Sequence, residues 1–82
     1  MDKIDIAGIK VRLQFLLDER GITVYKLAKD IGVHNLIIYN FLAEHNPYNL
    51  SLYTLGKISE YFGVSLSWLI KGYAIKERDK DV

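Results

Sequence analysis

The chain has 82 residues, half of them apolar, a formal net charge of +1 and no cysteine. This length allows one small domain with a single core, and the absence of cysteine excludes disulfides and thiolate zinc sites. No apolar stretch approaches the roughly 18 residues of a membrane span. We expect no signal peptide in residues 1–5, so the predicted location is the cytoplasm, whose reducing conditions suit a chain without cysteine.

Apolar residues recur at helical spacing in five segments, and no strand is predicted. The first helix is expected over residues 8–20, ending at Gly21, because a glycine commonly follows the last helical turn. Arg20 lies in that last turn, where a cation stabilises the helix dipole. The residues predicted to be buried are Ile9, Leu13, Leu16 and Leu17.

The second and third helices are predicted to follow closely upon each other. The second is expected over residues 24–31, between an N-cap at Thr23 and a terminating Gly32. Its inward residues are predicted to be Val24, Leu27, Ala28 and Ile31. The third helix is expected to start at a cap formed by His34 or Asn35 and to run to about residue 43. Its predicted buried stripe is Val33, Ile37, Ile38 and Phe41.

Residues 45–49 contain a proline and two asparagines and predict a turn before the last two helices. The fourth helix is expected over residues 52–62, capped by Ser51 and closed by Gly63. Its predicted inward residues are Leu52, Leu55, Ile58 and Phe62. The fifth helix is expected over residues 66–70, capped by Ser65 and ended by Gly72. Its predicted packing residues are Leu66, Trp68 and Leu69.

The predicted domain covers residues 8–72. Residues 1–7 are expected to form an N-terminal arm. Residues 73–82 alternate in charge without helical periodicity and are expected to form a flexible charged tail.

The most informative unit is the pair of short helices joined by a tight turn at residues 23–41. Ala28 is small enough for two helices to approach closely there, Gly32 can adopt a positive φ, and Ile38 can fill the wedge between them. The amino-terminal half of the third helix is then expected to project from the domain. A helix in that position can enter the major groove of DNA.

Four segments extend this pattern along the chain: Gly-Ile-Thr-Val-Tyr-Lys-Leu-Ala (21–28), Ile-Gly-Val (31–33), Leu-Ser-Leu-Tyr-Thr-Leu (50–55) and Phe-Gly-Val-Ser-Leu-Ser-Trp-Leu-Ile-Lys-Gly (62–72). In this order and spacing, from about Val11 to Gly72, the chain resembles the XRE family of Cro and lambda-repressor-type helix-turn-helix domains. The resemblance implies an all-α, five-helix lambda-repressor-like DNA-binding domain with a central helix-turn-helix. It also implies a cytoplasmic, phage- or plasmid-repressor-like transcriptional regulator that binds a two-fold operator in double-stranded DNA as a homodimer.

The resemblance further implies which residues contact DNA. The third helix is expected to contact base edges through His34, Asn35, Leu36, Tyr39 and Asn40. Asparagine can pair with adenine, and leucine can contact a thymine methyl group. The start of the second helix and the segment after the third are expected to contact the DNA backbone through Thr23, Tyr25, Lys26, Asn46, Tyr48, Asn49 and Ser51.

The chain departs from the family pattern by losing polar and cationic residues. Where family members usually carry Gln, Arg, Ser or Lys, this chain has Gln14, Leu17, Val24, Leu36, Tyr39 and Asn40. No Lys or Arg lies between Asp30 and Lys57. If the ligand is DNA, its phosphates are therefore expected to be met by cations elsewhere, namely Lys10, Arg12, Lys26, Lys29 or the tail.

An alternative function also fits the cation-poor third helix. The same fold could serve as a protein-interaction module, antitoxin-like or a partner-binding regulator, that uses the apolar face of this helix. For the DNA-binding function, the mechanism is expected to be occlusion of a promoter or contact with polymerase, and the possible protein partners are polymerase or an antirepressor-like protein.

The sequence offers no chemistry of an enzyme. It has no Gly-rich phosphate loop and no plausible nucleophile and base. His34 and His45 lack a third ligand at a suitable spacing, so no metal site is predicted. We therefore expect neither catalysis nor a cofactor.

Overall fold

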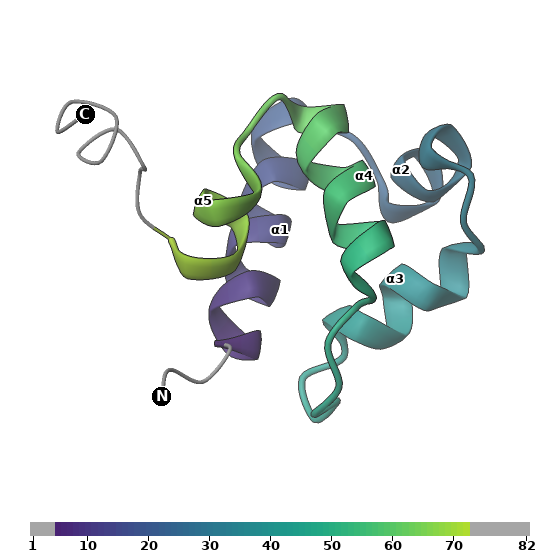
Figure 1. Ribbon diagram of the computed structural model, residues 1–82. Helices are drawn as coiled ribbons and strands as arrows, with labels where there is room; N and C mark the ends of the chain where they lie inside the picture. The colour runs from purple at the N-terminus through teal and green to yellow at the C-terminus, as the bar shows by residue number, and fades with distance from the viewer. Residues whose placement is uncertain (1–4, 73–82) are drawn as a thin grey trace, which may run out of the picture.

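The computed structural model describes residues 5–72 and shows five α-helices and no strand in that part of the chain. The helices are α1 (Ile6–Arg20), α2 (Val24–Ile31), α3 (Asn35–Leu42), α4 (Leu52–Phe62) and α5 (Leu66–Lys71) (Figure 1). The predicted all-α, five-helix fold is confirmed. The predicted flexible tail, and most of the predicted N-terminal arm, lie outside the described residues.

The helix ends follow from capping residues in the sequence. Thr23, Ser51 and Ser65 cap α2, α4 and α5 as predicted, each accepting a hydrogen bond from the backbone N–H three residues later. Helix α1 begins at Ile6, two residues earlier than expected, because the Asp5 carboxylate accepts the Gly8 N–H at 3.0 Å and forms a cap there. Helices α1, α2, α4 and α5 end at the predicted glycines, Gly21, Gly32, Gly63 and Gly72.

One hydrophobic core receives side chains from all five helices and from Leu50 in the α3–α4 loop. Most of the predicted inward residues are buried in it. They are Ile9, Leu13, Leu16, Leu17, Leu27, Ala28, Ile31, Ile38, Phe41, Leu55, Ile58, Phe62 and Leu69. Four more, Val24, Val33, Leu66 and Trp68, are partly buried against it.

Two predicted core residues are exposed, and these predictions are wrong. Leu52 is 68% exposed because it lies in the first turn of α4, about 120° around the helix from the buried Ile58. Thr54 is buried instead, with its hydroxyl accepting a hydrogen bond from Ser51. Ile37 is 45% exposed because Ile38 and Phe41 occupy the centre of the inward face of α3, which leaves Ile37 at its edge.

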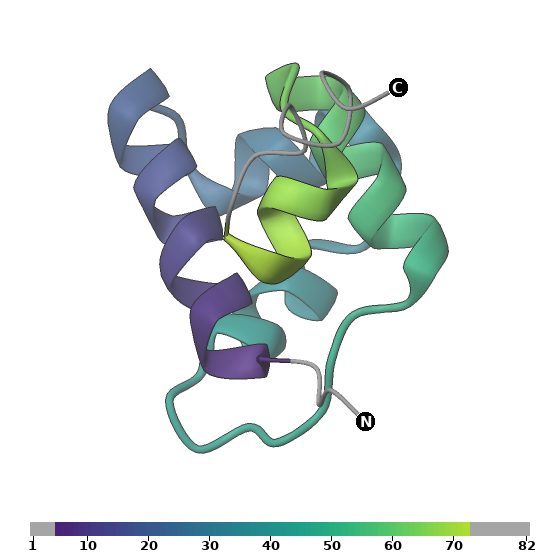
Figure 2. The ribbon, with the colours of Figure 1, turned by 60° about the vertical axis from the view of Figure 1, so that its left-hand side comes forward.

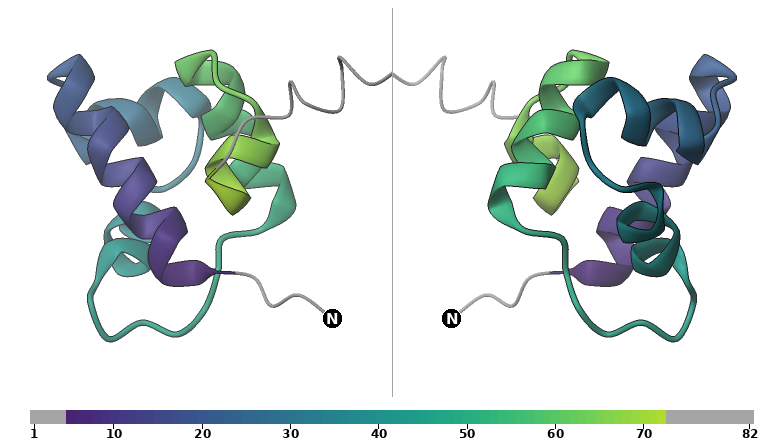
Figure 3. Two further views of the ribbon diagram at one scale, coloured as in Figure 1. Left: turned by 90° about the vertical axis from the view of Figure 1, so that its left-hand side faces the viewer. Right: turned by 90° about the vertical axis from the view of Figure 1, so that its right-hand side faces the viewer.

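The helix arrangement leaves α3 on one side of the molecule. Helix α5 packs against α1 and α4. It lies between them in Figure 2, and in Figures 1 and 3 it lies on the side of the domain away from α3. Helix α3 lies on the opposite side of the described structure from α5, and the α3–α4 loop passes below the first turns of α1 (Figure 3). The outer surface of α3 is therefore not covered by another described helix. None of the helices in residues 5–72 has the length and apolar run that a membrane crossing requires.

Three cationic side chains of α1 bind carbonyl groups at the carboxyl-terminal ends of other helices. The Arg12 guanidinium donates to the carbonyls of Leu69 and Ile70 at 2.8 Å each, and Arg20 donates to the carbonyl of Phe62 at 2.7 Å. Carbonyl groups at a helix end lack intrahelical donors and carry the negative end of the dipole. Arg12 and Arg20 therefore join α1 to the ends of α5 and α4.

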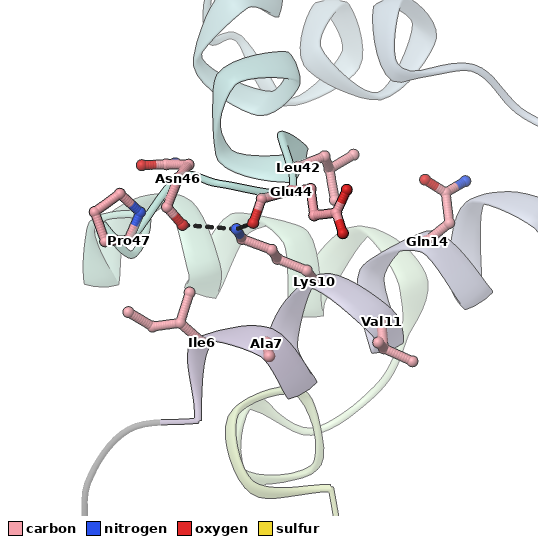
Figure 4. A pocket seen from close by; sticks show the side chains of 9 residues that line it. All are labelled: Ile6, Ala7, Lys10, Val11, Gln14, Leu42, Glu44, Asn46 and Pro47. Carbon is pink, nitrogen blue, oxygen red and sulfur yellow. Dashed lines mark hydrogen bonds between the residues drawn. The ribbon is translucent and has the colours of Figure 1, made fainter.

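Lys10 makes the equivalent contact at the end of α3. Its ammonium donates to the carbonyl of Ala43 at 2.8 Å. It also donates to the carbonyl of Asn46 at 2.7 Å, with a longer bond of 3.4 Å to the carbonyl of Glu44 (Figure 4). The same ammonium lies 5.9 Å from the centre of the Phe41 ring. Lys10 thus fixes the start of the α3–α4 loop to α1.

Candidate nucleic-acid interface

The turn between α2 and α3 has the geometry that its sequence predicts. Gly32 has a φ of 82°, a left-handed conformation that costs other residues free energy. The N–H groups of Gly32 and Val33 both donate to the carbonyl of Ala28, at 2.9 and 3.0 Å. Ala28 is 1% exposed and Ile38 is fully buried, so the two helices meet over a small residue and an apolar wedge.

His34 is the N-cap of α3. The sequence had predicted either His34 or Asn35 in this role. The His34 Nδ1 atom accepts the N–H of Leu36 at 3.1 Å, which requires that nitrogen to be unprotonated. Asn35 is the first residue of α3 and is half-buried. Within residues 5–72 no group of three His, Asp or Glu side chains is placed to hold a metal ion.

The outward face of α3 consists of Leu36, Tyr39 and Asn40, together with Ile37 at the edge between this face and the core, and all four are exposed to solvent. Leu36 is 54% and Tyr39 is 48% exposed. Three of the predicted base-reading residues, Leu36, Tyr39 and Asn40, therefore share this face, and Ile37 joins them where a core residue had been predicted. Exposed apolar side chains that lie together on one helix are characteristic of a binding surface.

The two asparagines after α3 hold the loop in shape. The Asn46 amide group donates to the carbonyl of Asn40 at 2.9 Å, and its side-chain oxygen accepts the Tyr48 N–H at 3.1 Å. The Asn49 side-chain oxygen accepts the N–H of Leu50 at 2.8 Å. Asn46 and Asn49, predicted to contact DNA phosphates, thus have their side chains engaged with the loop backbone.

The Asn40 carboxamide differs from those of Asn46 and Asn49. It makes no hydrogen bond to another residue in the described range 5–72, while its backbone carbonyl accepts bonds from Asn46 and from the Ala43 N–H at 3.2 Å. The main chain is fixed and the exposed amide is available to a ligand.

A hollow of about 270 Å³ lies between α3 and the loop that follows it. It is lined by Ile37, Asn40 and Phe41 on the helix side and by Tyr48, Asn49 and Ser51 among the loop residues. Ile37 remains exposed because the loop leaves this space open beside it. The exposure of Ile37 thus depends on the path of the loop, which helical periodicity does not reveal.

The starts of α2 and α4 contain the remaining residues predicted to contact the DNA backbone. The Thr23 hydroxyl accepts the Lys26 N–H at 3.0 Å, and the Ser51 hydroxyl accepts the Thr54 N–H at 3.1 Å. The first N–H groups of each helix have no acceptor within the helix, and such groups bind anions. Tyr25 and Tyr48 are exposed, with Tyr48 at 76%.

A small network joins α2 to α4 beside the turn. The Lys26 ammonium lies 3.1 Å from the Asp30 carboxylate, which also accepts the Tyr61 hydroxyl at 2.6 Å. The bond from Tyr61, and then that from Lys26, hold the pKa of Asp30 below its ordinary value. The same carboxylate raises the pKa of Lys26 and of Tyr61. Lys26 is therefore a cation partly balanced by a neighbouring carboxylate.

The structure changes which cations are available to a ligand. Lys10 and Arg12, expected from the sequence to meet phosphates, have their donors directed at carbonyl groups at the ends of α3 and α5. Lys29 is exposed in the last turn of α2. The sequence did not predict these bonds to carbonyl groups. The one signal for them was the presence of three cations, Lys10, Arg12 and Arg20, on the first helix.

Comparisons with known proteins agree with this geometry. Residues 11–75 match the sequence model of a family described as "Helix-turn-helix domain". No curated protein matches the chain in sequence. The chain is similar in structure to a hypothetical transcription factor, NHTF, from Neisseria, with a TM-score of 0.70 and 16% identity. The similarity covers 100% of this chain and 95% of the Neisseria chain, and it supports the fold. Because the family match extends over most of its length, the chain belongs to the helix-turn-helix domain family.

Proposed function

We propose that this protein is a sequence-specific DNA-binding transcriptional regulator of the XRE type, which inserts α3 into the major groove. The observation that carries the proposal is the exposed outward face of α3, held at a defined angle by the α2–α3 turn and its buried wedge, Ile38. The similarity to a protein described as a hypothetical transcription factor agrees with this function. A binding role of this kind requires neither catalysis nor a cofactor.

In this proposal Leu36, Tyr39 and Asn40 contact base edges, with His34 and Asn35 at the start of α3. The helix starts at Thr23 and Ser51 flank α3 in sequence and present free backbone N–H groups to phosphates. The phenols of Tyr25 and Tyr48 are exposed and can donate to phosphate oxygens. The Asn46 amide acts by shaping the loop that carries Tyr48, while the Asn49 amide nitrogen can donate to a phosphate.

A single domain of this size contacts few base pairs, so we propose that two copies bind a two-fold operator. Regulation would follow from occlusion of a promoter, as a repressor does, in the cytoplasm. The dimer surface and the operator sequence are to be found by experiment.

The test is a fluorescence-anisotropy titration with duplex DNA from upstream of the protein's own coding region, repeated at several salt concentrations. Each phosphate contact made by a cation contributes about −0.9 to the slope of log K against log salt. With Lys26 and Lys29 as the described cations nearest the turn, we expect a shallow slope of about −1 to −2 per protomer. Asn40→Ala and Tyr39→Ala should each weaken binding at least about fivefold.

Glu19→Gln is the matched control, because Glu19 is exposed near the far end of α1. It should bind DNA like the wild type. If Asn40→Ala and Tyr39→Ala also bind like the wild type, the assignment of the α3 face is wrong.

A second function is favoured by one observation, the apolar character of the α3 face. Leu36, Ile37 and Tyr39 are all about half exposed, and no cation lies within α3. Such a face also suits a protein partner, so the domain could act as an antitoxin-like or partner-binding regulator. Absence of DNA binding at low salt, together with a partner whose capture is lost in Leu36→Ala, would favour this function over the first.

A further inference from the structure

We propose that the outward face of α3 recognises A·T base pairs, with Asn40 binding adenine and with Leu36 and Ile37 contacting thymine methyl groups. This inference rests on the proposed DNA-binding function and specifies the class of base that α3 selects.

The first argument is the lack of a guanine-binding side chain on this face. The commonest specific contact to guanine is an Arg or Lys that binds its O6 and N7 atoms. Helix α3 contains neither residue type. The three cations of α1, which are Lys10, Arg12 and Arg20, donate to backbone carbonyls and do not lie on α3. The chemistry within α3 is therefore limited to amide, phenol and alkyl groups, with the imidazole of His34 at its cap.

The second argument is the state of the Asn40 amide. A carboxamide can donate to adenine N7 and accept from adenine N6, which is the paired contact that identifies adenine in the major groove. The side-chain amide of Asn40 makes no hydrogen bond to another residue between 5 and 72. The backbone carbonyl of Asn40 accepts hydrogen bonds from the Asn46 side chain and from the Ala43 N–H. It is thus exposed, uncommitted and attached to a fixed main chain.

The third argument is the position of the alkyl groups. Leu36 is 54% and Ile37 is 45% exposed, and Ile37 borders the 270 Å³ hollow together with Asn40. Both are within four positions of Asn40 on α3, so alkyl and amide groups can meet neighbouring bases. An alkyl group gains contact with a thymine methyl but desolvates the polar edges of guanine and cytosine without replacing their hydrogen bonds.

The experiment begins with selection of bound duplexes from a random-sequence DNA library by the full chain. The selected half-sites should be rich in A·T pairs, and Asn40→Ala should lose preference at one adenine position. The selected duplex is then made with deoxyuridine in place of thymidine, which removes only the thymine methyl groups. The wild type should lose about fourfold in affinity for each contacted methyl, the effect of one buried methyl group.

The variants Leu36→Ala and Ile37→Ala should each reduce this thymine-to-uracil difference. Leu36 is more exposed than Ile37, so its variant remains informative if Ile37→Ala lowers stability, and Glu19→Gln should keep the full difference. Selection of G·C-rich sites, or a uracil effect below twofold, overturns the inference while DNA binding stands. Failure to select any sequence overturns both this inference and the proposed function.

Discussion

The contact of Lys10 with the end of α3 leads to a quantitative prediction for Lys10→Met. Methionine keeps an unbranched side chain of similar length but removes the ammonium and its two short bonds to the carbonyls of Ala43 and Asn46, at 2.8 and 2.7 Å. A hydrogen bond from a charged donor contributes about 1.5–3 kcal/mol. Because these carbonyls are part-buried and water can partly replace the ammonium, we expect a loss of about 2–3 kcal/mol. For a domain of this size that corresponds to a decrease in Tm of roughly 10–20 °C.

The assay is thermal unfolding followed by circular dichroism, combined with urea denaturation to obtain the free energy of unfolding. Lys29→Met is the matched control, since Lys29 is an exposed lysine at the end of α2 with no carbonyl bond to another residue of the described range. It should cost less than about 0.5 kcal/mol. If Lys10→Met is no more destabilising than Lys29→Met, the view that Lys10 fixes the loop to α1 is refuted.

Further predictions concern a pair of glycines and one carboxylate. Gly32→Ala should lower the free energy of unfolding by about 1 kcal/mol. A Cβ at this position meets open space, so the only unfavourable effect is the φ of 82°, which alanine adopts less readily than glycine. Gly72→Ala should lower the free energy of unfolding by more, about 1.5–2 kcal/mol, because its Cβ would lie 2.5 Å from Nη1 of Arg12 and the guanidinium, which donates to two carbonyls through Nε and Nη2, must shift; equal losses in urea denaturation would contradict this. The lowered pKa of Asp30 predicts that wild type is more stable than Asp30→Asn above the ordinary carboxylate pKa, and that the advantage disappears as the pH falls through the lowered value. Melting curves at neutral pH and at about pH 2 measure this, and an equal difference at both would show that the bond from Tyr61 does not stabilise the ionised carboxylate.

The helices and their ends could be predicted because they depend on short-range sequence. A capping hydroxyl accepts an N–H three residues away, and a terminating glycine acts on the turn that precedes it. Thr23, Ser51 and Ser65 therefore identified the starts of three helices correctly. Helix α1 starts two residues before the predicted position, because the Asp5 carboxylate caps it ahead of the apolar residues Ile9 and Leu13 on which the prediction depended.

The exposure of individual apolar residues could not be predicted in the same way. Helical periodicity gives the direction of a side chain and not what lies opposite it. Ile37 points toward the α3–α4 loop, and that loop leaves a hollow beside it. Leu52 lies at the very start of α4, before the helix reaches the core. Both outcomes depend on the path of residues 43–51, which is set by tertiary contacts such as that of Lys10.

The carbonyl groups that bind the α1 cations also could not be predicted from the sequence, for a related reason. A lysine or arginine on an exposed helical position is normally solvated, and its partner here lies more than 30 positions away in the chain. The exposure of Leu36, Tyr39 and Asn40 was easier to predict, because helical periodicity places them opposite the buried Ile38 and Phe41. The hydrogen bonds of the Asn46 and Asn49 side chains to the loop backbone were likewise not predictable, because they depend on the path of the loop.

The placement of charge and the chemistry of the α3 face are connected. Cations that a DNA-binding domain can use for phosphates serve in this chain to hold helix ends together, through Lys10, Arg12 and Arg20. Non-specific affinity for DNA arises mainly from such cations, and these three are already bound to carbonyl groups within residues 5–72. A regulator built this way must gain more of its affinity from contacts that only the correct sequence provides. In the proposed complex, the amide of Asn40 and the alkyl groups of Leu36 and Ile37 supply contacts of that kind. The use of the α1 cations within the fold is thus consistent with the proposed selective recognition of A·T pairs.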